Sequence, residues 1–118
     1  MTIQLEEKKL ELDGKTYTLH VNMCVLDRVQ EAHNGNLKEL MDQSVNSVST
    51  EVMACMLNDW AEDMGWDEHW SDKDVKKRFS LAALKELDVF GMFIRAITPS
   101  NVYTAEKPKM PENESSGN

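Results

Sequence analysis

The chain lacks the features on which several classes of protein depend. It has two cysteines, Cys24 and Cys55, which stand far apart and lack the paired spacing of zinc motifs. Its longest apolar runs are a few residues, too short to span a bilayer. No glycine-rich loop could cradle a phosphate, and aromatic and basic residues do not interleave. We therefore expect no zinc site, no membrane span and no phosphate-binding loop.

Positive charge is also scarce. With 13 Lys and Arg against 21 Asp and Glu, the formal net charge is -8, which disfavours binding to phosphate backbones. The densest basic run, Lys76-Lys77-Arg78, is interpreted as a solvated helix face, and we expect no nucleic-acid partner. The first residues contain no apolar signal-peptide core, which predicts a cytoplasmic protein. In such a reducing compartment we expect Cys24 and Cys55 to be small buried hydrophobic residues.

The most regular stretch predicts a β-hairpin within residues 3–21. Asp13-Gly14 tolerates the positive φ that both central positions of a type I′ turn require, and this turn places Leu10 opposite Tyr17. The apolar face then also carries Leu12, Leu19 and Val21, and the opposite, polar face carries Glu11, Thr16, Thr18 and His20. Because an isolated hairpin is marginal in water, we expect the following helices to support it, with His20 solvated.

Two parts of the hairpin are candidates for contact between copies of the chain. Ile3 and Leu5 would point away from the face that carries Leu10, so they form either a less regular extension of the strand or a contact with another subunit. The unpaired outer edge of the hairpin could also pair with a neighbour.

The spacing of apolar residues predicts a first long helix after the hairpin, capped by Asn22 and ended near Gly35, and then a short helix over residues 37–41. Residues 42–49 are polar and rich in Ser and Asn, which predicts a loop. The clearest amphipathic helix is expected to begin at Ser49 or Thr50 and to end at Gly65.

The last part of the chain predicts further helices. Ser71 and Asp74 have the spacing of a capping box, which starts a short helix. From Ser80 the helix restarts or continues, and Thr98-Pro99 closes it. Gly91 weakens that helix by about 1 kcal/mol against Ala, so we expect it to pack closely against a neighbour.

Together these elements predict an α+β fold, an N-terminal β-hairpin packed on a mainly α-helical bundle of four to five helices. We expect a single domain over residues 1–99. Residues 100–118 are rich in Pro, Glu and Ser, which predicts a flexible, disordered C-terminal tail.

The sequence predicts no catalytic site. None of His20, His33 and His69 lies in a recognisable nucleophile motif. Asp67, Glu68 and His69 are residue types that bind metals, but adjacent residues rarely point at one ion, and no second pair of ligands stands at helical spacing. This segment is interpreted as a solvated connector. We expect no catalytic residue, no metal and no cofactor.

Methionine and tryptophan are the candidate residues for binding a partner. The chain has eight methionines and three tryptophans. The candidates follow one helix and the connector after it: Met53, Met56, Trp60, Met64, Trp66 and Trp70. Such a stripe is either core or a binding groove that adapts to its partner, because Met side chains change shape easily. Three tryptophans within residues 60–70 are more than a small core readily hides, which favours contact with a partner.

The order of these motifs resembles the phage tail assembly chaperones. The pattern Leu-x-Leu-Asp-Gly-Lys-x-Tyr-x-Leu over residues 10–19 is followed by Asn22 and a helix through Leu26 and Glu31. The step Leu37-Lys-Glu-Leu40 then follows a glycine, and a helix with an apolar stripe and a closing helix come after it. The resemblance covers about residues 5–98.

The resemblance implies a non-enzymatic protein of a siphophage or prophage that acts in the bacterial cytoplasm. It implies that the chain coats the tape-measure protein, recruits tail-tube subunits before the tube polymerises, and forms homo-oligomers. The family often has a longer product made by ribosomal frameshifting, which would depart from the segment that begins at Ser100. The family supplies no catalytic residues, so the candidate contacts remain those of the Met and Trp stripe.

A different class of function also fits a small acidic helical protein. It could be a regulator, such as an antitoxin or a nucleic-acid-mimicking inhibitor, whose carboxylates meet a basic partner. That alternative predicts carboxylates gathered on one face, whereas here they are spread over every predicted element.

Overall fold

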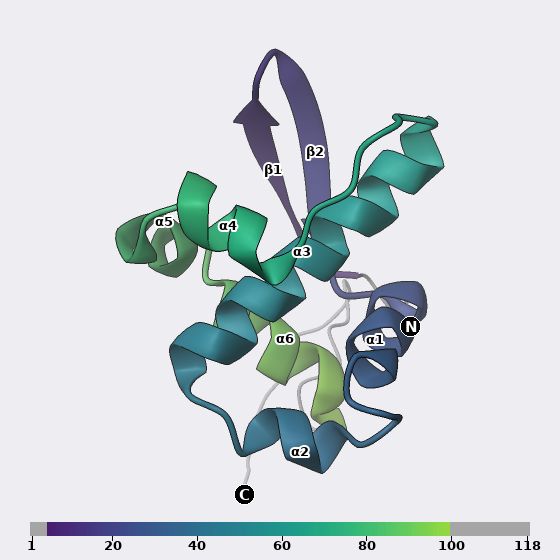
Figure 1. Ribbon diagram of the computed structural model, residues 1–118, viewed down its shortest axis with the longest axis vertical. Coiled ribbons are helices and arrows are strands. Elements are labelled where there is room, and N and C mark those ends of the chain that lie inside the picture. Colours follow the sequence, from purple (N-terminus) through teal and green to yellow (C-terminus); the bar gives the residue numbers. More distant parts are fainter. Residues whose placement is uncertain (1–4, 100–118) are drawn as a thin grey trace, which may run out of the picture.

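The computed structural model describes residues 5–99 (Figure 1). Its elements are β1 (Glu7–Leu12), β2 (Lys15–His20), α1 (Met23–Glu31), α2 (Leu37–Met41), α3 (Val45–Met64), α4 (Asp72–Arg78), α5 (Leu81–Glu86) and α6 (Val89–Ile97). The predicted α+β fold, a hairpin on a helical bundle, is confirmed, with six helices in this range rather than four or five. None of these helices is both long enough and apolar enough to cross a membrane. Ile3 and the predicted tail lie outside the described residues.

Helix α3 is the centre of the fold. It runs through the middle of the molecule, and β2, α1, α4 and α6 pack around it (Figure 1). The fully buried residues of α3 include Val52, Met53, Met56 and Leu57. They share one core with Val25 and Val29 of α1, Leu40 of α2, Val75 of α4, and Met92 and Phe93 of α6. Because α3 has neighbours on several sides, its buried residues do not form a single narrow stripe.

The hairpin has the predicted turn and register. Asp13 and Gly14 have φ values of 53° and 77°, as a two-residue type I′ turn requires. Leu10 lies opposite Tyr17 across the antiparallel pair. Tyr17, Leu19 and Val21 are buried, so the predicted apolar face is confirmed.

The predicted polar face of the hairpin is not uniformly exposed, and the expectation of a solvated His20 is wrong. Thr18 is buried and accepts a hydrogen bond of 2.8 Å from Lys9 Nζ. The side chain of His20 is only 12% exposed and lies edge-on to Trp60. Strand β2 packs against α3, and Asp59 and Trp60 of that helix lie beside His20. Alternation in sequence instead describes a strand with one open face.

The capping motifs are found where the sequence places them. Asn22 accepts a hydrogen bond of 2.8 Å from the Val25 N–H, which caps α1. Ser71 and Asp74 form the reciprocal bonds of a capping box at α4. Gly65 ends α3 with a φ of 73°. Local side-chain chemistry therefore sets these three helix ends.

The predicted loop over residues 42–49 is confirmed for 42–44 and wrong for 45–49, because α3 begins at Val45. Ser44 caps it by accepting a bond of 3.2 Å from the Ser47 N–H. Inside the helix, Ser49 Oγ donates to the Val45 carbonyl at 2.8 Å, and Thr50 Oγ1 donates to the Ser47 carbonyl at 3.1 Å. The hydroxyl groups of Ser49 and Thr50 are thus hydrogen-bonded within the helix, and both residues can be buried. Their burial against the core outweighs the weak helix preference of Ser and Thr.

Two helices, α5 and α6, form between Ser80 and Thr98, rather than one continuous helix. Ser80 caps the short helix α5, and α6 starts after Asp88, whose φ of 53° breaks the helical path. Arg95 of α6 bonds the Asp88 carboxylate at 2.8 Å and the Glu6 carboxylate at 2.7 and 2.9 Å. These bonds connect the break, the last helix and the start of the described chain. The predicted close of the helix at Thr98 is confirmed.

The two cysteines lie on separate helices and are free. Cys24 is exposed on α1, so the expectation that it is buried is wrong. Cys55 of α3 is partly buried, and burial, with a smaller effect of the nearby Glu51 carboxylate, raises the pKa of its thiol to about 12.

Gly91 does pack closely, but against its own chain one turn earlier. A Cβ atom on Gly91 would lie 2.4 Å from Asp88 Oδ1. We expect Gly91→Ala to be neutral or destabilising in the natural chain, since it displaces the carboxylate that Arg95 holds. In an Asp88→Gly background the same change should stabilise the protein by about 1 kcal/mol, the usual helix preference of Ala over Gly. Urea unfolding of the four variants measures both effects, and equal stabilisation in both backgrounds would contradict the packing.

Candidate functional site

The structure divides the six candidate partner-binding residues into core and surface. Met53 and Met56 are 0% and 1% exposed, and Trp70 is buried too. Trp60 and Trp66 are partly buried against the core, whereas Met64 at the end of α3 is 46% exposed. The sequence left open whether these residues form the core or a binding groove, and Met53 and Met56 belong to the core. A partner could reach them only if the helices around α3 separated.

The partly buried tryptophans contact the hairpin. Trp60 Nε1 donates a hydrogen bond of 3.2 Å to the Thr16 carbonyl of β2. The Trp66 ring meets the Tyr17 ring edge-on at 5.1 Å, and Lys15 Nζ lies 4.9 Å from the Trp66 ring centre. These rings attach a two-stranded hairpin that would be marginal by itself. Most of the tryptophan surface is therefore used inside the protein.

Glu68 is the polar centre of this attachment. Its carboxylate accepts hydrogen bonds from Lys15 Nζ at 2.6 Å, Tyr17 Oη at 2.5 Å and Trp70 Nε1 at 3.1 Å. Burial by itself raises the pKa of Glu68, but these three donors outweigh it and hold the pKa below the ordinary value. Burial and the hydrogen bond to Glu68 raise the pKa of Tyr17 to about 12. We call Lys15, Tyr17, Glu68 and Trp70 the hairpin anchor.

The connector was expected to be solvated, and this is wrong for Glu68, which was also considered as a metal ligand. Asp67 and His69 are exposed on either side of it, while Glu68 turns inward to the hairpin anchor. In residues 5–99, no group of three His, Cys, Asp or Glu side chains is placed to hold a metal ion.

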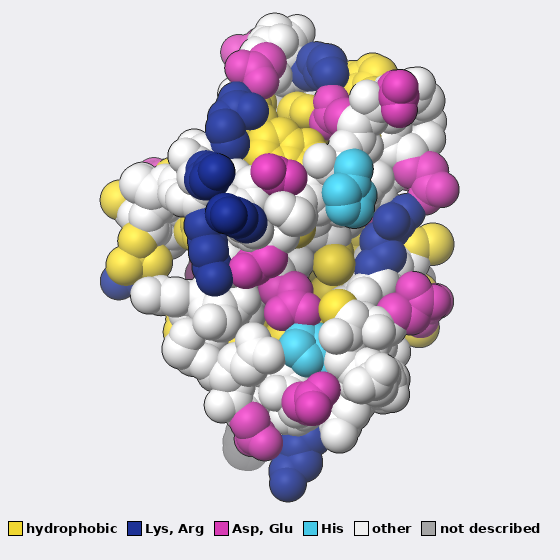
Figure 2. All heavy atoms as spheres, in the orientation of Figure 1, with side chains coloured by type: hydrophobic (Ala, Val, Ile, Leu, Met, Phe, Trp, Pro, Cys, Tyr) yellow, Lys and Arg dark blue, Asp and Glu magenta, His cyan; other side chains and the backbone are white. Residues whose placement is uncertain are grey.

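The basic run of α4 is exposed, and one of its members also contacts the hairpin. Figure 2 shows Lys and Arg side chains gathered over α4. Arg78 Nη2 lies 2.9 Å from Asp13 Oδ2 of the turn, and its guanidinium lies 5.5 Å from the Trp70 ring. Lys76 pairs with Asp72 at 3.0 Å within α4, and Lys77 is exposed.

His20, which is mostly covered, and His33, which is buried, lie beside carboxylates. His20 Nε2 is 3.8 Å from Asp59 and 2.9 Å from the Asn22 amide nitrogen. His33, in the turn after α1, has its two ring nitrogens 3.4 Å from Glu39 and 2.6 Å from Glu51. Each histidine thus joins separate elements of the fold, a role that the sequence did not predict for either of them.

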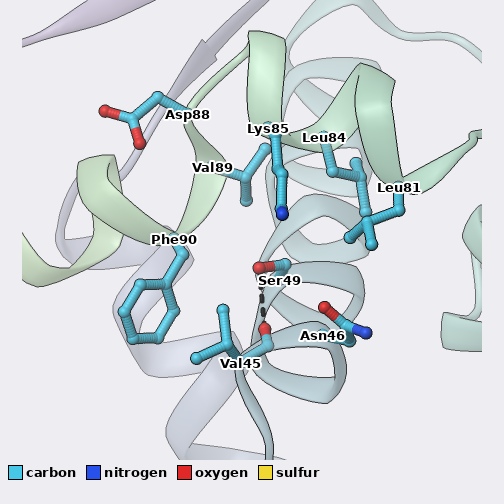
Figure 3. Close-up of a pocket in the computed structure, with 9 residues that line it drawn as sticks. All are labelled: Val45, Asn46, Ser49, Leu81, Leu84, Lys85, Asp88, Val89 and Phe90. Atoms are coloured by element: carbon cyan, nitrogen blue, oxygen red, sulfur yellow. Dashed lines mark hydrogen bonds between the residues drawn. The ribbon is translucent and has the colours of Figure 1, made fainter.

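A hollow of about 260 Å³ opens between the first turn of α3, α5 and the start of α6 (Figure 3). Its apolar lining is Val45, Leu81, Leu84, Val89 and Phe90, and its polar lining is Asn46, Ser49, Lys85 and Asp88. Val45 and Leu81 are 53% and 45% exposed at its rim. Sequence reasoning missed this site because it placed Val45 in a loop. The useful signal was a capping serine followed at once by a large apolar residue, which occurs at Ser44 and again at Ser80.

Comparison of the chain with protein-family models, with curated proteins and with solved structures gave no match.

Two methionines of α3 provide a direct test of which candidates are core. We expect Met56→Ala to lower the free energy of unfolding by about 2–5 kcal/mol, because it leaves a cavity in a packed core. Met64→Ala, on the same helix, should change it by less than about 0.5 kcal/mol, since its side chain is half exposed. Chemical unfolding measures both. A small loss for Met56→Ala would show that the core does not depend on this side chain.

The hairpin anchor predicts how stability depends on pH. Because the pKa of Glu68 is lowered in the folded protein, its contribution is full above the ordinary glutamate pKa of 4.5 and is lost as the pH falls through the folded value. We expect Glu68→Gln to cost about 1–3 kcal/mol at pH 7 and to flatten the loss of stability in acid.

Glu11→Gln is the matched control, since Glu11 is exposed on β1. It should leave both the stability at pH 7 and its acid dependence unchanged. Urea unfolding at several pH values, followed by tryptophan fluorescence, compares the variants. The same acid dependence in Glu68→Gln as in the natural chain would contradict the role of this carboxylate.

Proposed function

We propose that this chain is a phage tail assembly chaperone that binds the tape-measure protein and recruits tail-tube subunits in the host bacterial cytoplasm. The observation that carries the proposal is the order of its elements. An Asp-Gly hairpin leads into an Asn22-capped helix, then the short helix α2, the long helix α3 and the closing helices. The resemblance to that family implies this order, with one closing helix where α4, α5 and α6 follow α3 here. The proposal includes self-association and no enzymatic activity.

The distribution of apolar side chains supports a role in binding. Large apolar residues remain exposed at the ends of several elements: Leu5, Met23, Met41, Val45, Met64 and Leu81. Two of them, Val45 and Leu81, border the hollow between α3, α5 and α6. An exposed apolar surface beside a hollow is suited to the apolar face of a partner helix. A tape-measure protein rich in amphipathic helices would supply such faces.

The alternative function, an acidic regulator that binds a basic partner, gains no support. Figure 2 shows Asp and Glu side chains interspersed with Lys and Arg on the face in view. Several carboxylates are occupied by basic residues of the chain itself, such as Glu6 by Arg95 and Asp13 by Arg78. These pairs use charge to join elements rather than to present one acidic face.

The proposal predicts a solubilising activity that can be measured. A tape-measure fragment that aggregates when expressed alone should remain soluble when the full chain is co-expressed, and should co-purify with it. The control is co-expression of an unrelated small acidic protein, which should not retain the fragment. Aggregation of the tape-measure fragment in the presence of the full chain would contradict the proposed function.

A further inference from the structure

The hollow between α3, α5 and α6 is built by two helix starts and a helix break. Val45 and Leu81 are the first residues of α3 and α5, and Val89 is the first residue of α6. Figure 3 shows Val45 and Phe90 on one side of the hollow and Leu81 and Leu84 on the other. Leu84 and Val89 are buried and form part of the core, so the apolar lining is held by packed residues.

The size of the hollow limits what it can hold. Its volume of about 260 Å³ is below the range of about 300–1,000 Å³ that is typical of pockets for cofactors and drug-sized ligands. One or two apolar side chains are a better match to such a volume. Since the rim residues Val45 and Leu81 are themselves half exposed, an entering side chain would cover apolar surface on both sides.

The polar groups around the hollow favour a negative charge in the occupant. Lys85 extends across the hollow in Figure 3, and within the described part of the chain no carboxylate pairs with it. The hollow also adjoins the N-terminal end of the 20-residue helix α3, whose first turn contains no acidic residue. A helix N-terminus carries partial positive charge, so it adds to the effect of Lys85.

The acidic residue that lines the hollow does not cancel this charge. Figure 3 shows the Asp88 carboxylate directed away from the apolar lining. It is bonded to Arg95 at 2.8 Å, on the side of α6 where Arg95 also binds Glu6. Lys85 therefore remains the charge that faces an occupant.

We propose that this hollow binds an amphipathic helix of a partner protein, with one apolar side chain inserted between Val45 and Leu81. A carboxylate three or four residues from that side chain lies on the same face of the partner helix and pairs with Lys85. The identity of the partner as the tape-measure protein rests on the proposed function. Beyond the proposed function, the inference names the binding surface on this chain. It also names the pattern that this surface selects in the partner helix, an apolar residue with an acidic residue one helical turn away.

The first test compares two charge reversals of equal size in the full chain, with a tape-measure fragment as the probe. We expect Lys85→Glu to weaken binding by about tenfold or more, because it places like charges at the contact. Lys73→Glu on α4 changes the net charge equally at another exposed position and should change binding less than about twofold. Leu81→Glu should also weaken binding by about tenfold or more, and an acidic residue in the first turn of α5 is compatible with folding.

Circular dichroism and thermal unfolding establish that each variant is folded. If the natural chain binds the tape-measure fragment, and Lys85→Glu and Lys73→Glu bind it with equal affinity, the inference is overturned and the proposed function remains intact. Failure of the natural chain to bind the fragment would overturn the proposed function and this inference with it.

The second test identifies the occupant directly. A photo-crosslinking amino acid replaces Leu81 in the full chain, and for comparison Met23, which is 70% exposed on α1, in a second variant. We expect the variant at position 81 to crosslink the tape-measure fragment and the variant at position 23 not to do so. A crosslink from position 81 to a second copy of the chain, or to residues 100–118 of the same chain, would overturn the inference.

Discussion

The burial of α3 is the constraint on which the rest of the structure depends. A chain of this size has room for one modest core, and here one long helix supplies its centre. Val52, Met53, Met56 and Leu57 point to several neighbours, so α3 needs elements around much of its circumference. The hairpin and the short helices supply these elements, and α6 adds Val89, Met92 and Phe93 to the core. Contacts with α3 and with one another therefore set the positions of these elements.

The hairpin shows how polar contacts complete this arrangement. Tyr17 and Leu19 contribute apolar surface, but two strands by themselves are marginally stable. The Glu68 carboxylate supplies what is missing, since it accepts bonds from two residues of β2 and from Trp70 of the connector. A buried carboxylate without such donors would cost free energy, whereas with three of them it fixes the hairpin in one position. One of the two acids of the connector, Glu68, is therefore structural, whereas Asp67 is exposed.

Sequence reasoning predicted the parts of the fold that depend on neighbouring residues. The Asp13-Gly14 turn, the Asn22 cap, the Ser71–Asp74 capping box and the Gly65 stop each follow from local backbone chemistry, and each is present. The errors concern burial by distant segments. Residues 45–49 are polar enough to look like a loop, but Val48 and Ser49 are buried in the fold. His20 looks solvated in the sequence, but Trp60 lies beside it. At the break, Asp88 is bonded by Arg95 seven residues later, a contact that no periodicity in the apolar residues reveals.

The candidate binding residues were also misjudged where distant segments bury them, and this changes where a binding surface should be sought. Met and Trp were chosen because they are large and adaptable, but those qualities also suit the centre of a small core, where Met53 and Met56 are found. Apolar surface remains available to a partner at the starts of α3 and α5. Val45 and Leu81 occupy such positions, each directly after a capping serine. Both capping serines are exposed, and so are the apolar residues that follow them.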